Sequence, residues 1–177
     1  MRLFIAIEIP KPVRDEIMKV ENRMRQLCAG GRPVAEDNLH ITLHFIGESD
    51  ELVPAVEAMR SSVLGIRPFI LKADKFGCFS RGSEYTSYVS VGGDLNELFA
   101  LHESLQSALG DRGFRTEQKR YRPHITIGRN VRLDSAAKQE LALLTPNASF
   151  TVNSIVLFES TRGGGRMNYT PLHKEGF

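Results

Sequence analysis

The chain has 177 residues, of which 41% are hydrophobic and 25% charged, and its formal net charge at pH 7 is +2. This length and composition fit one globular domain with a substantial core and exclude an intrinsically disordered chain. So small a net charge does not by itself indicate a protein that coats nucleic acid through non-specific charge attraction. Two cysteines, Cys28 and Cys78, are too few for a disulfide scaffold or a thiolate metal site, so we expect a reducing, cytoplasmic location.

The amino-terminal quarter predicts a strand, a helix and a second strand. Residues 2–9 favour the first strand, whose apolar run at 3–7 is too short for a signal peptide or a membrane-spanning helix. We therefore expect no association with a membrane. Residues 12–27 carry apolar side chains at three- and four-residue steps, which is typical of an amphipathic helix. The next strand is expected at about 39–46.

The middle of the chain predicts a helix, two strands and another helix. Asp50 is expected to cap the first of these helices. Strands are expected at about 67–78 and 84–91, because the segment between them, 79–83, has the composition of a hairpin turn. Asp94 is expected to cap the second helix.

The carboxyl-terminal third repeats this order. A strand near residue 124 is followed by a helix that begins at Asp134 and by strands near 149–158 and 167–173. Helices and strands thus mix without the strict alternation of a doubly wound parallel sheet. The sequence therefore favours an α+β fold with largely antiparallel sheets.

One four-residue pattern occurs twice: histidine, isoleucine, threonine and an apolar residue. The copies are His40-Ile41-Thr42-Leu43 and His124-Ile125-Thr126-Ile127. Polar and apolar residues alternate in both, as in half-buried strands. Side chains two apart on a strand share a face, so each histidine should project with its threonine on the side away from the core.

The two copies are 84 positions apart, and the same spacing recurs elsewhere. Tyr85-Thr86 returns as Tyr169-Thr170 at that distance, which indicates an internal duplication. Two related halves would place two imidazoles about a shared cleft on a pseudo-twofold axis. A paired acid and base require this arrangement.

The paired motifs suit the chemistry of a phosphodiester. One imidazole can accept a proton from a nucleophile while the other protonates a leaving oxygen, and the two threonine hydroxyls can donate to anionic oxygens. Seven basic residues against one acid lie between Arg112 and Arg132, giving a positive field beside the second motif. A solvated loop face is the alternative explanation of this basic segment.

The histidines could also have roles other than acid–base catalysis. His40 and His44 have a spacing that binds zinc on a helix, but on a strand four residues span about 13 Å. That distance is too long for one ion with bonds of about 2 Å, so no metal is expected. The motif histidines could instead only satisfy core hydrogen bonds. His44, His102 and His173 have no matched partner and are expected to be surface or packing residues, although alternation places His44 on the face of His40.

At the two motifs the sequence resembles the two-histidine phosphoesterase superfamily, whose hallmark is a repeated His-x-Thr/Ser-apolar motif. The opening residues 2–6, the flanks of the first motif, the run Arg122-Pro123-His124 and the later Arg129 resemble its LigT-like branch. That branch contains the RNA 2',3'-cyclic phosphodiesterases, also called 2'-5' RNA ligases. The resemblance covers essentially the whole chain.

This resemblance implies a single bilobal phosphoesterase domain over residues 1–177. Its α+β fold would have two duplicated lobes with mostly antiparallel sheets, helices outside and a central cleft. The implied activity is hydrolysis of RNA 2',3'-cyclic phosphate ends to 2'-phosphates, with reversible 2'-5' joining. The resemblance implies no metal and no cofactor, and we expect a monomer without an obligate protein partner.

Roles for four motif residues also follow from the resemblance. His124 is expected to activate water as the base, and His40 to protonate the departing 3' oxygen as the acid. Thr42 and Thr126 are expected to hold the nonbridging oxygens of the phosphate.

Two flanking residues are implicated in binding substrate. Arg129 would add positive charge, and Phe45 would offer a ring on which a base stacks. Strict alternation points both away from the histidines. Either a bulge or a twist turns them round, or these two assignments are wrong.

Two alternative functions stay open at this point. One is a nucleotide- or RNA-binding module of the same fold without turnover, against which the completeness of both motifs argues. The other is a phosphodiesterase acting on another cyclic or 2'-5'-linked substrate.

Overall fold

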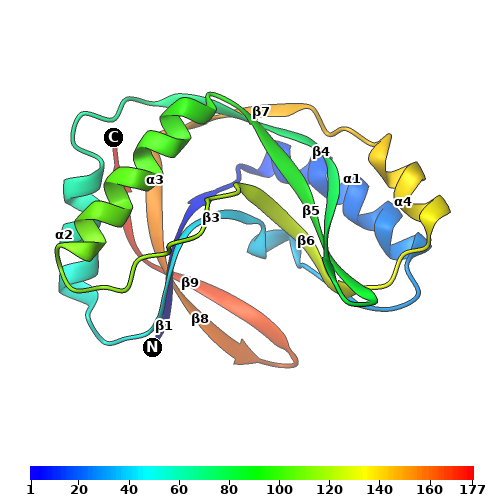
Figure 1. The fold of residues 1–177 in the computed structure, drawn as a ribbon, viewed down its shortest axis with the longest axis horizontal. Coiled ribbons are helices and arrows are strands. Elements are labelled where there is room, and N and C mark those ends of the chain that lie inside the picture. Colours follow the sequence, from blue (N-terminus) through cyan, green and yellow to red (C-terminus); the bar gives the residue numbers. More distant parts are fainter.

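The computed structural model describes all residues 1–177 as four helices around one nine-stranded antiparallel sheet (Figure 1). The helices are α1 (Lys11–Leu27), α2 (Leu52–Ser62), α3 (Leu95–Gly110) and α4 (Ser135–Ala142), with a short 3-10 helix η1 (Glu36–Asn38). The strands are β1 (Arg2–Glu8), β2 (Arg32–Pro33), β3 (His40–Glu48), β4 (Phe69–Arg81), β5 (Glu84–Gly93), β6 (His124–Val131), β7 (Ala148–Val152), β8 (Ser154–Gly163) and β9 (Arg166–Gly176). The α+β prediction is confirmed, but one continuous sheet takes the place of the separate sheets that we expected.

The two motif strands lie side by side at the centre of the sheet. The strand order is β7-β4-β5-β6-β3-β1-β8-β9, with β2 added beside β6. β3 and β6 meet through the pair Ile41–Ile125, and these residues are 84 positions apart. An antiparallel pair formed by equivalent residues relates its two strands by a local twofold rotation. β1 beside β3 and β5 beside β6 extend the same relation outward.

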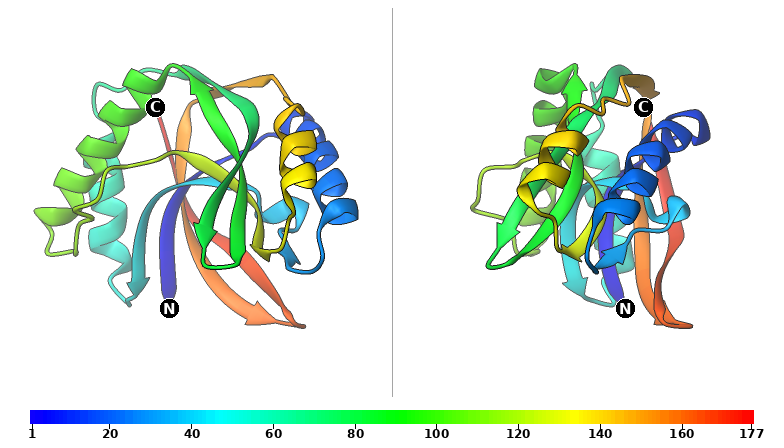
Figure 2. Two further views of the ribbon diagram at one scale, coloured as in Figure 1. Left: turned by 45° about the vertical axis from the view of Figure 1, so that its right-hand side comes forward. Right: turned by 90° about the vertical axis from the view of Figure 1, so that its right-hand side faces the viewer.

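The sheet curls strongly, and the helices cover its convex side in two pairs (Figure 2). α2 packs against α3 at one end of the molecule and α1 against α4 at the other. In α1 the residues at three- and four-residue steps are the buried ones, as predicted: Val13, Ile17, Val20 and Met24. None of the four helices has the length and apolar character needed to cross a bilayer.

One predicted strand, residues 149–158, is in fact two strands. Asn153 alone separates β7, which pairs with β4, from β8, which pairs with β1. These partners lie in opposite halves of the strand order, so the curl of the sheet must bring its two ends together at Asn153. A strand pattern in sequence does not reveal this change of partner, because the strands that the two segments pair with lie elsewhere in the chain.

Strand β1 is buried on both faces. Leu3, Ile5 and Ile7 join the main core beneath the helices. On the opposite face Phe4 and Ala6 form a second cluster, completed from β8 by Val156 and Phe158. This small cluster matters for the site, because it lies on the face from which the motif histidines project.

Each motif strand contains a β-bulge, and the two bulges are equivalent. The register pairs on either side are Ala6↔Thr42 and Ile5↔His44 in β3, and Tyr88↔Thr126 and Ser87↔Gly128 in β6. Leu43 and Ile127 are therefore extra residues without an opposite partner, and they are 84 positions apart. A bulge shifts the in–out alternation of the strand by one residue.

The bulges correct one prediction and resolve a conflict. His44 is 1% exposed on the core side of β3, so its predicted place on the face of His40 is wrong. After the shift, Phe45 and Arg129 return to the side of the histidines. A bulge therefore accounts for the orientation of Phe45 and Arg129, and their roles in binding substrate stay predictions.

The helix caps follow the predictions only in part. Asp134 caps α4, because its carboxylate accepts a hydrogen bond of 2.7 Å from the amide of Ala137. Asp94 stands at the cap of α3, but its carboxylate accepts from the amide of Ile70 instead. Asp50 is not a cap: its carboxylate lies 3.2 Å from the amino-terminal ammonium group.

The bulge in β6 should be sensitive to added volume. A Cβ atom at Gly128 would lie 2.7 Å from Met24 Cε and 2.7 Å from Val131 Cγ2, both in the core. Gly128→Ala should lower the free energy of unfolding by about 1–3 kcal/mol, measured by urea denaturation. Gly110→Ala is the control, because its Cβ would meet nothing closer than 3.4 Å. Equal stability of the two variants would contradict the argument.

Candidate active site

His40 opens β3, and both of its ring nitrogens are engaged. Nδ1 lies 2.7 Å from the carbonyl oxygen of Asn38 and therefore carries the proton, because a carbonyl can only accept. Nε2 lies 3.0 Å from Thr42 Oγ1 and accepts the hydroxyl proton. The neutral ring thus presents an unprotonated Nε2, held in place by its own motif threonine.

His124 opens β6 in the same way. Its Nδ1 lies 2.7 Å from the carbonyl oxygen of Arg122, which is again two residues upstream. The same backbone geometry therefore fixes the same tautomer in both motifs. Nε2 of His124 makes no hydrogen bond within the chain and is available to a ligand.

The threonines lie across the strands from the histidines. The antiparallel pair Ile41–Ile125 sets a register in which Thr126 stands opposite His40 and Thr42 opposite His124. Opposite residues in such a pair have Cβ atoms about 4.5–5.5 Å apart. The four motif side chains therefore form one compact patch on the face away from the core.

Arg129 and Phe45 occupy equivalent positions beyond the two bulges. The positive charge of Arg129 lowers the pKa of both motif histidines. Phe45 is 54% exposed, and its ring centroid lies 6.0 Å from that of Phe4. The structure thus brings together all six residues that the sequence singled out.

Each histidine also rests against a stacked pair of aromatic rings. His40 lies 5.0 Å from Phe4, which stacks on Phe158, and 5.3 Å from the ring of Tyr169. His124 lies 5.1 Å from Phe79 and 5.6 Å from Tyr88, which stack on each other. Sequence analysis missed these rings. Phe4 and Tyr88 are 84 positions apart and could have been found from that spacing.

Burial among these rings lowers the pKa of both histidines. The pKa of His40 falls from 6.5 to about 4, mainly through burial, with further lowering by the charges of Arg129 and His124. The Asn38 carbonyl opposes this change. Burial likewise lowers the pKa of His124, and Arg129 adds to the effect. In the free protein, both imidazoles are therefore neutral at pH 7.

Tyr121 ties the two motifs together from the side. Its hydroxyl donates a hydrogen bond of 2.9 Å to the carbonyl oxygen of Thr42, and burial raises its pKa so that the proton stays in place. The ring stacks on His102 at 3.9 Å with an interplanar angle of 4°. No pattern in the sequence points to Tyr121, because the residue 84 positions earlier is Asp37.

The remaining histidines lie outside this patch. Gln106 joins His44 to the region of His102, with its amide nitrogen 2.8 Å from His44 Nδ1. His173 bonds to Glu175 on β9. No group of three or more histidine, cysteine, aspartate or glutamate side chains is gathered as metal ligands, and both cysteines are free.

The family follows from comparison with known proteins. A family model described as the 2'-5' RNA ligase superfamily matches residues 10–164. The chain belongs to this superfamily. It is 34% identical to an RNA 2',3'-cyclic phosphodiesterase of Methanocaldococcus jannaschii over 138 residues, covering 78% of this chain and 76% of that protein. The Escherichia coli RNA 2',3'-cyclic phosphodiesterase is 31% identical over 179 residues, covering 98% and 94%.

Solved structures place the chain in the LigT-like RNA 2',3'-cyclic phosphodiesterase family. Escherichia coli LigT in its apo form superposes with a TM-score of 0.76 at 31% identity, covering 99% of this chain and 96% of LigT. LigT in complex with 3'-AMP gives 0.76 at 29% identity, covering 99% and 97%. The Thermus thermophilus protein TT0787 gives 0.80 at 23% identity, which supports the fold alone.

The lowered pKa values can be tested directly by following the ring protons of His40 and His124 by NMR against pH. His40 should protonate with a midpoint near pH 4, and His124 below 6.5, because burial favours the neutral ring. In urea both should return to about 6.5. A midpoint of 6.5 or higher for His40 in the folded protein would show that the imidazole is solvated.

Proposed function

We propose that this protein hydrolyses RNA 2',3'-cyclic phosphate ends to 2'-phosphates by paired-histidine general acid–base catalysis. One observation carries the proposal: His40 and His124 each fix Nδ1 on a carbonyl oxygen, present Nε2 on one face and share Arg129. Curated relatives that are 30–34% identical bear the name RNA 2',3'-cyclic phosphodiesterase, in agreement with it.

In the proposed reaction His124 acts as the base and His40 as the acid. Nε2 of neutral His124 takes a proton from water as the water oxygen bonds to phosphorus. The bond from phosphorus to the 3' oxygen breaks on the opposite side, and Nε2–H of His40 protonates that oxygen. The product is a 2'-phosphate. The proton from water ends on His124, and exchange with solvent restores both rings.

The substrate itself would prepare the acid. A phosphodiester is an anion, and a negative charge beside His40 raises the pKa that burial has lowered. Once Nε2 carries a proton, Thr42 no longer donates to it and can turn its hydroxyl to a nonbridging oxygen. Thr126 and Arg129 would hold the same oxygens as charge grows on them.

The two halves account for the paired geometry. We place the cleft on a pseudo-twofold axis through the Ile41–Ile125 pair and attribute it to duplication within a single bilobal domain of residues 1–177. The equivalent bulges and the equivalent carbonyl partners of the histidines support this. The same displacement, with a 5' hydroxyl in place of water as the nucleophile, would break the bond from phosphorus to the 3' oxygen and join RNA ends through a 2'-5' bond. The proposed partner is RNA with a cyclic end, bound by a monomer.

Replacing each motif histidine tests the pair. His40→Ala and His124→Ala should each reduce kcat on an oligonucleotide ending in 2',3'-cyclic phosphate by about 10²- to 10⁴-fold. The fold loss of kcat in the double variant should be much smaller than the product of the two single fold losses, because the residues act as a unit. His173→Ala, which is bonded only to Glu175, is the control and should keep full turnover. A folded single variant with near-normal kcat would refute the mechanism.

A substrate with an easy leaving group separates the acid from the base. A nitrophenyl phosphodiester releases its leaving group without a proton, so hydrolysis needs only the base. His40→Ala should therefore lose much less activity on this substrate than on the cyclic phosphate, whereas His124→Ala should lose activity on both. The reverse pattern would exchange the two roles.

The pH dependence of turnover follows from the direction of the pKa shifts. The profile of kcat/KM reports the free enzyme, in which both histidine pKa values lie below 6.5. One ring must be protonated and the other neutral, so the profile should be bell-shaped with its optimum below pH 6.5. The two apparent pKa values of the profile belong to the coupled pair of histidines and not to either residue alone. The optimum of kcat should lie higher, because bound phosphate raises the pKa of the acid. Coincident optima above pH 7 would contradict this account.

A further inference from the structure

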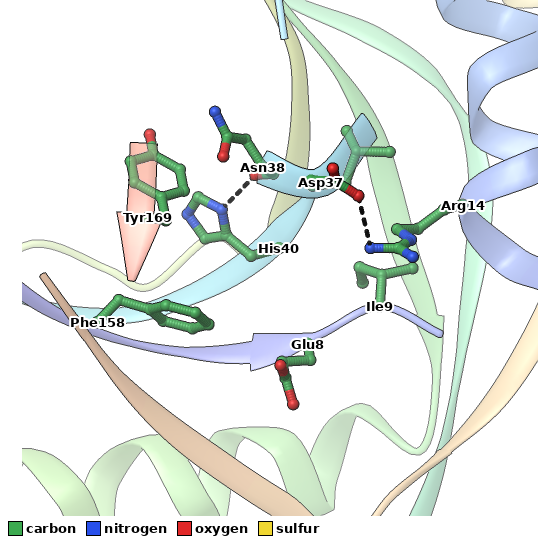
Figure 3. A pocket seen from close by; sticks show the side chains of 9 residues that line it. Glu8, Ile9, Arg14, Asp37, Asn38, His40, Phe158 and Tyr169 are labelled. Atoms are coloured by element: carbon green, nitrogen blue, oxygen red, sulfur yellow. Dashed lines mark hydrogen bonds and ion pairs between the residues drawn. The ribbon is translucent and has the colours of Figure 1, made fainter. Parts of the chain in front are cut away.

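A groove leads away from His40 on one side of the site (Figure 3). Its inner part lies against His40 and Phe158, and its outer part reaches the turn between β8 and β9. Both parts are lined by Asp37, Asn38 and Tyr169, so they are continuous. From Tyr169 to Arg166 the groove follows four residues of β9, whose three steps span about 10 Å.

This groove belongs to one half of the molecule only. Neither His124, Thr126 nor Arg129 lines it. The counterpart of Asp37 in the second half is Tyr121, whose ring is stacked on His102 and whose hydroxyl is bonded behind Thr42. At the position equivalent to Asp37, whose exposed carboxylate lines the groove, the second half therefore has a packed tyrosine ring.

The proposed reaction also treats the two sides of the site differently. Water approaches phosphorus on the side of His124 and brings nothing else with it. The leaving 3' oxygen belongs to the ribose, so the ribose and the whole RNA strand that precedes it lie on the side of the acid, His40. A substrate longer than one nucleotide must therefore extend from the site on the side where the groove is found.

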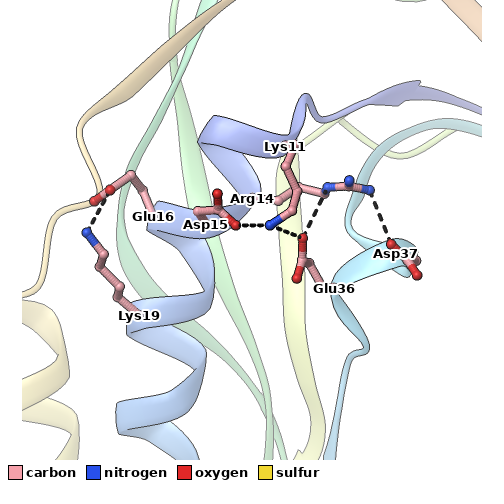
Figure 4. Close-up of polar contacts among 7 residues, drawn as sticks. All are labelled: Lys11, Arg14, Asp15, Glu16, Lys19, Glu36 and Asp37. Atoms are coloured by element: carbon pink, nitrogen blue, oxygen red, sulfur yellow. Dashed lines mark hydrogen bonds and ion pairs between the residues drawn. The ribbon is translucent and has the colours of Figure 1, made fainter.

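The side chains along the groove suit a nucleotide. Tyr169 stands beside His40, where it can meet a base or a ribose (Figure 3). Asn38 donates from Nδ2 to the carbonyl oxygen of Met167 at 2.7 Å, which leaves its amide oxygen and second N–H for a ligand. Arg166 is exposed at the outer end, where a backbone phosphate would pass. Arg14 is less suited to a phosphate, because Glu36 and Asp37 already flank its guanidinium group at 3.7 and 3.5 Å (Figure 4).

We propose that this groove binds the nucleotide preceding the cyclic phosphate end, so that the preferred substrates are oligonucleotides and not mononucleotides. The inference rests on the proposed function and on His40 being the acid. Tyr169 and Asn38 contact the sugar and base of that nucleotide, and Arg166 contacts its phosphate. Phe45 lines neither part of the groove and stays available to the terminal base.

Turnover of two substrates tests the groove. We would compare a nucleoside 2',3'-cyclic phosphate with a dinucleotide ending in the same group. The dinucleotide should have the higher kcat/KM, on the order of 10- to 100-fold if one additional base is held. Arg166→Ala should reduce this ratio of kcat/KM values several-fold. It should also lower the slope of log kcat/KM for the dinucleotide against log salt concentration by about 1, and leave kcat/KM for the mononucleotide unchanged. Arg81→Ala, an exposed arginine on the β4–β5 hairpin, is the matched control and should change neither rate.

Equal kcat/KM for the two substrates, or equal effects of the two arginine variants, would overturn the groove assignment while leaving the proposed function intact. Binding separates the two proposals further. A dinucleotide ending in 2'-phosphate should bind the wild type more tightly than a nucleoside 2'-phosphate, measured by calorimetry. If neither cyclic substrate is hydrolysed, the proposed function fails, and this difference in affinity still decides whether the groove binds a nucleotide.

Discussion

The pairing of the two motif strands through Ile41 and Ile125 is the contact on which the site depends. Both side chains are fully buried in the main core, and this is the one register pair that joins β3 to β6. Burial on one face of the sheet therefore sets the distance between two imidazoles on the other face. Tyr121 adds a second tie beside this pair, because it leads into the second motif and bonds to the backbone of the first.

The same β-bulge occurs in both motif strands, but it presents different side chains in the two halves. Each bulge returns the fifth residue after its histidine to the site, as a phenylalanine in one strand and an arginine in the other. The preceding residue then faces the core. In β3 this position holds the His44 imidazole, which is hydrogen-bonded to Gln106. In β6 it holds Gly128, and the side chains of Met24 and Val131 occupy the space that a larger residue would need. The backbone is nearly symmetric, but the side chains on both faces make the halves chemically distinct.

Local patterns in the sequence predicted much of the fold and the centre of the site. Period-two alternation placed the histidines with their threonines, and the helical stripe of α1 was correct. Alternation failed at His44 because a bulge adds one residue that leaves no mark on polarity. The position of Asp94 was found, but its hydrogen bond to Ile70 depends on a neighbouring strand. Tyr121 and Phe79 were missed because their roles arise from contacts between elements far apart in sequence.

Charge balance gives a reason why only one of the equivalent positions, Arg129 or Phe45, is charged. The proposed substrate is a monoanion, and its reaction begins with positive charge on Arg129 and on the acid. In the proposed reaction the product is a phosphate monoester, which can take a second negative charge. It would lie between Arg129 and the His124 ring that has just received a proton. A second arginine in place of Phe45 would lower the pKa of both histidines further and would hold the product dianion more tightly. A neutral ring there keeps the acid available and lets the product leave when His124 loses its proton.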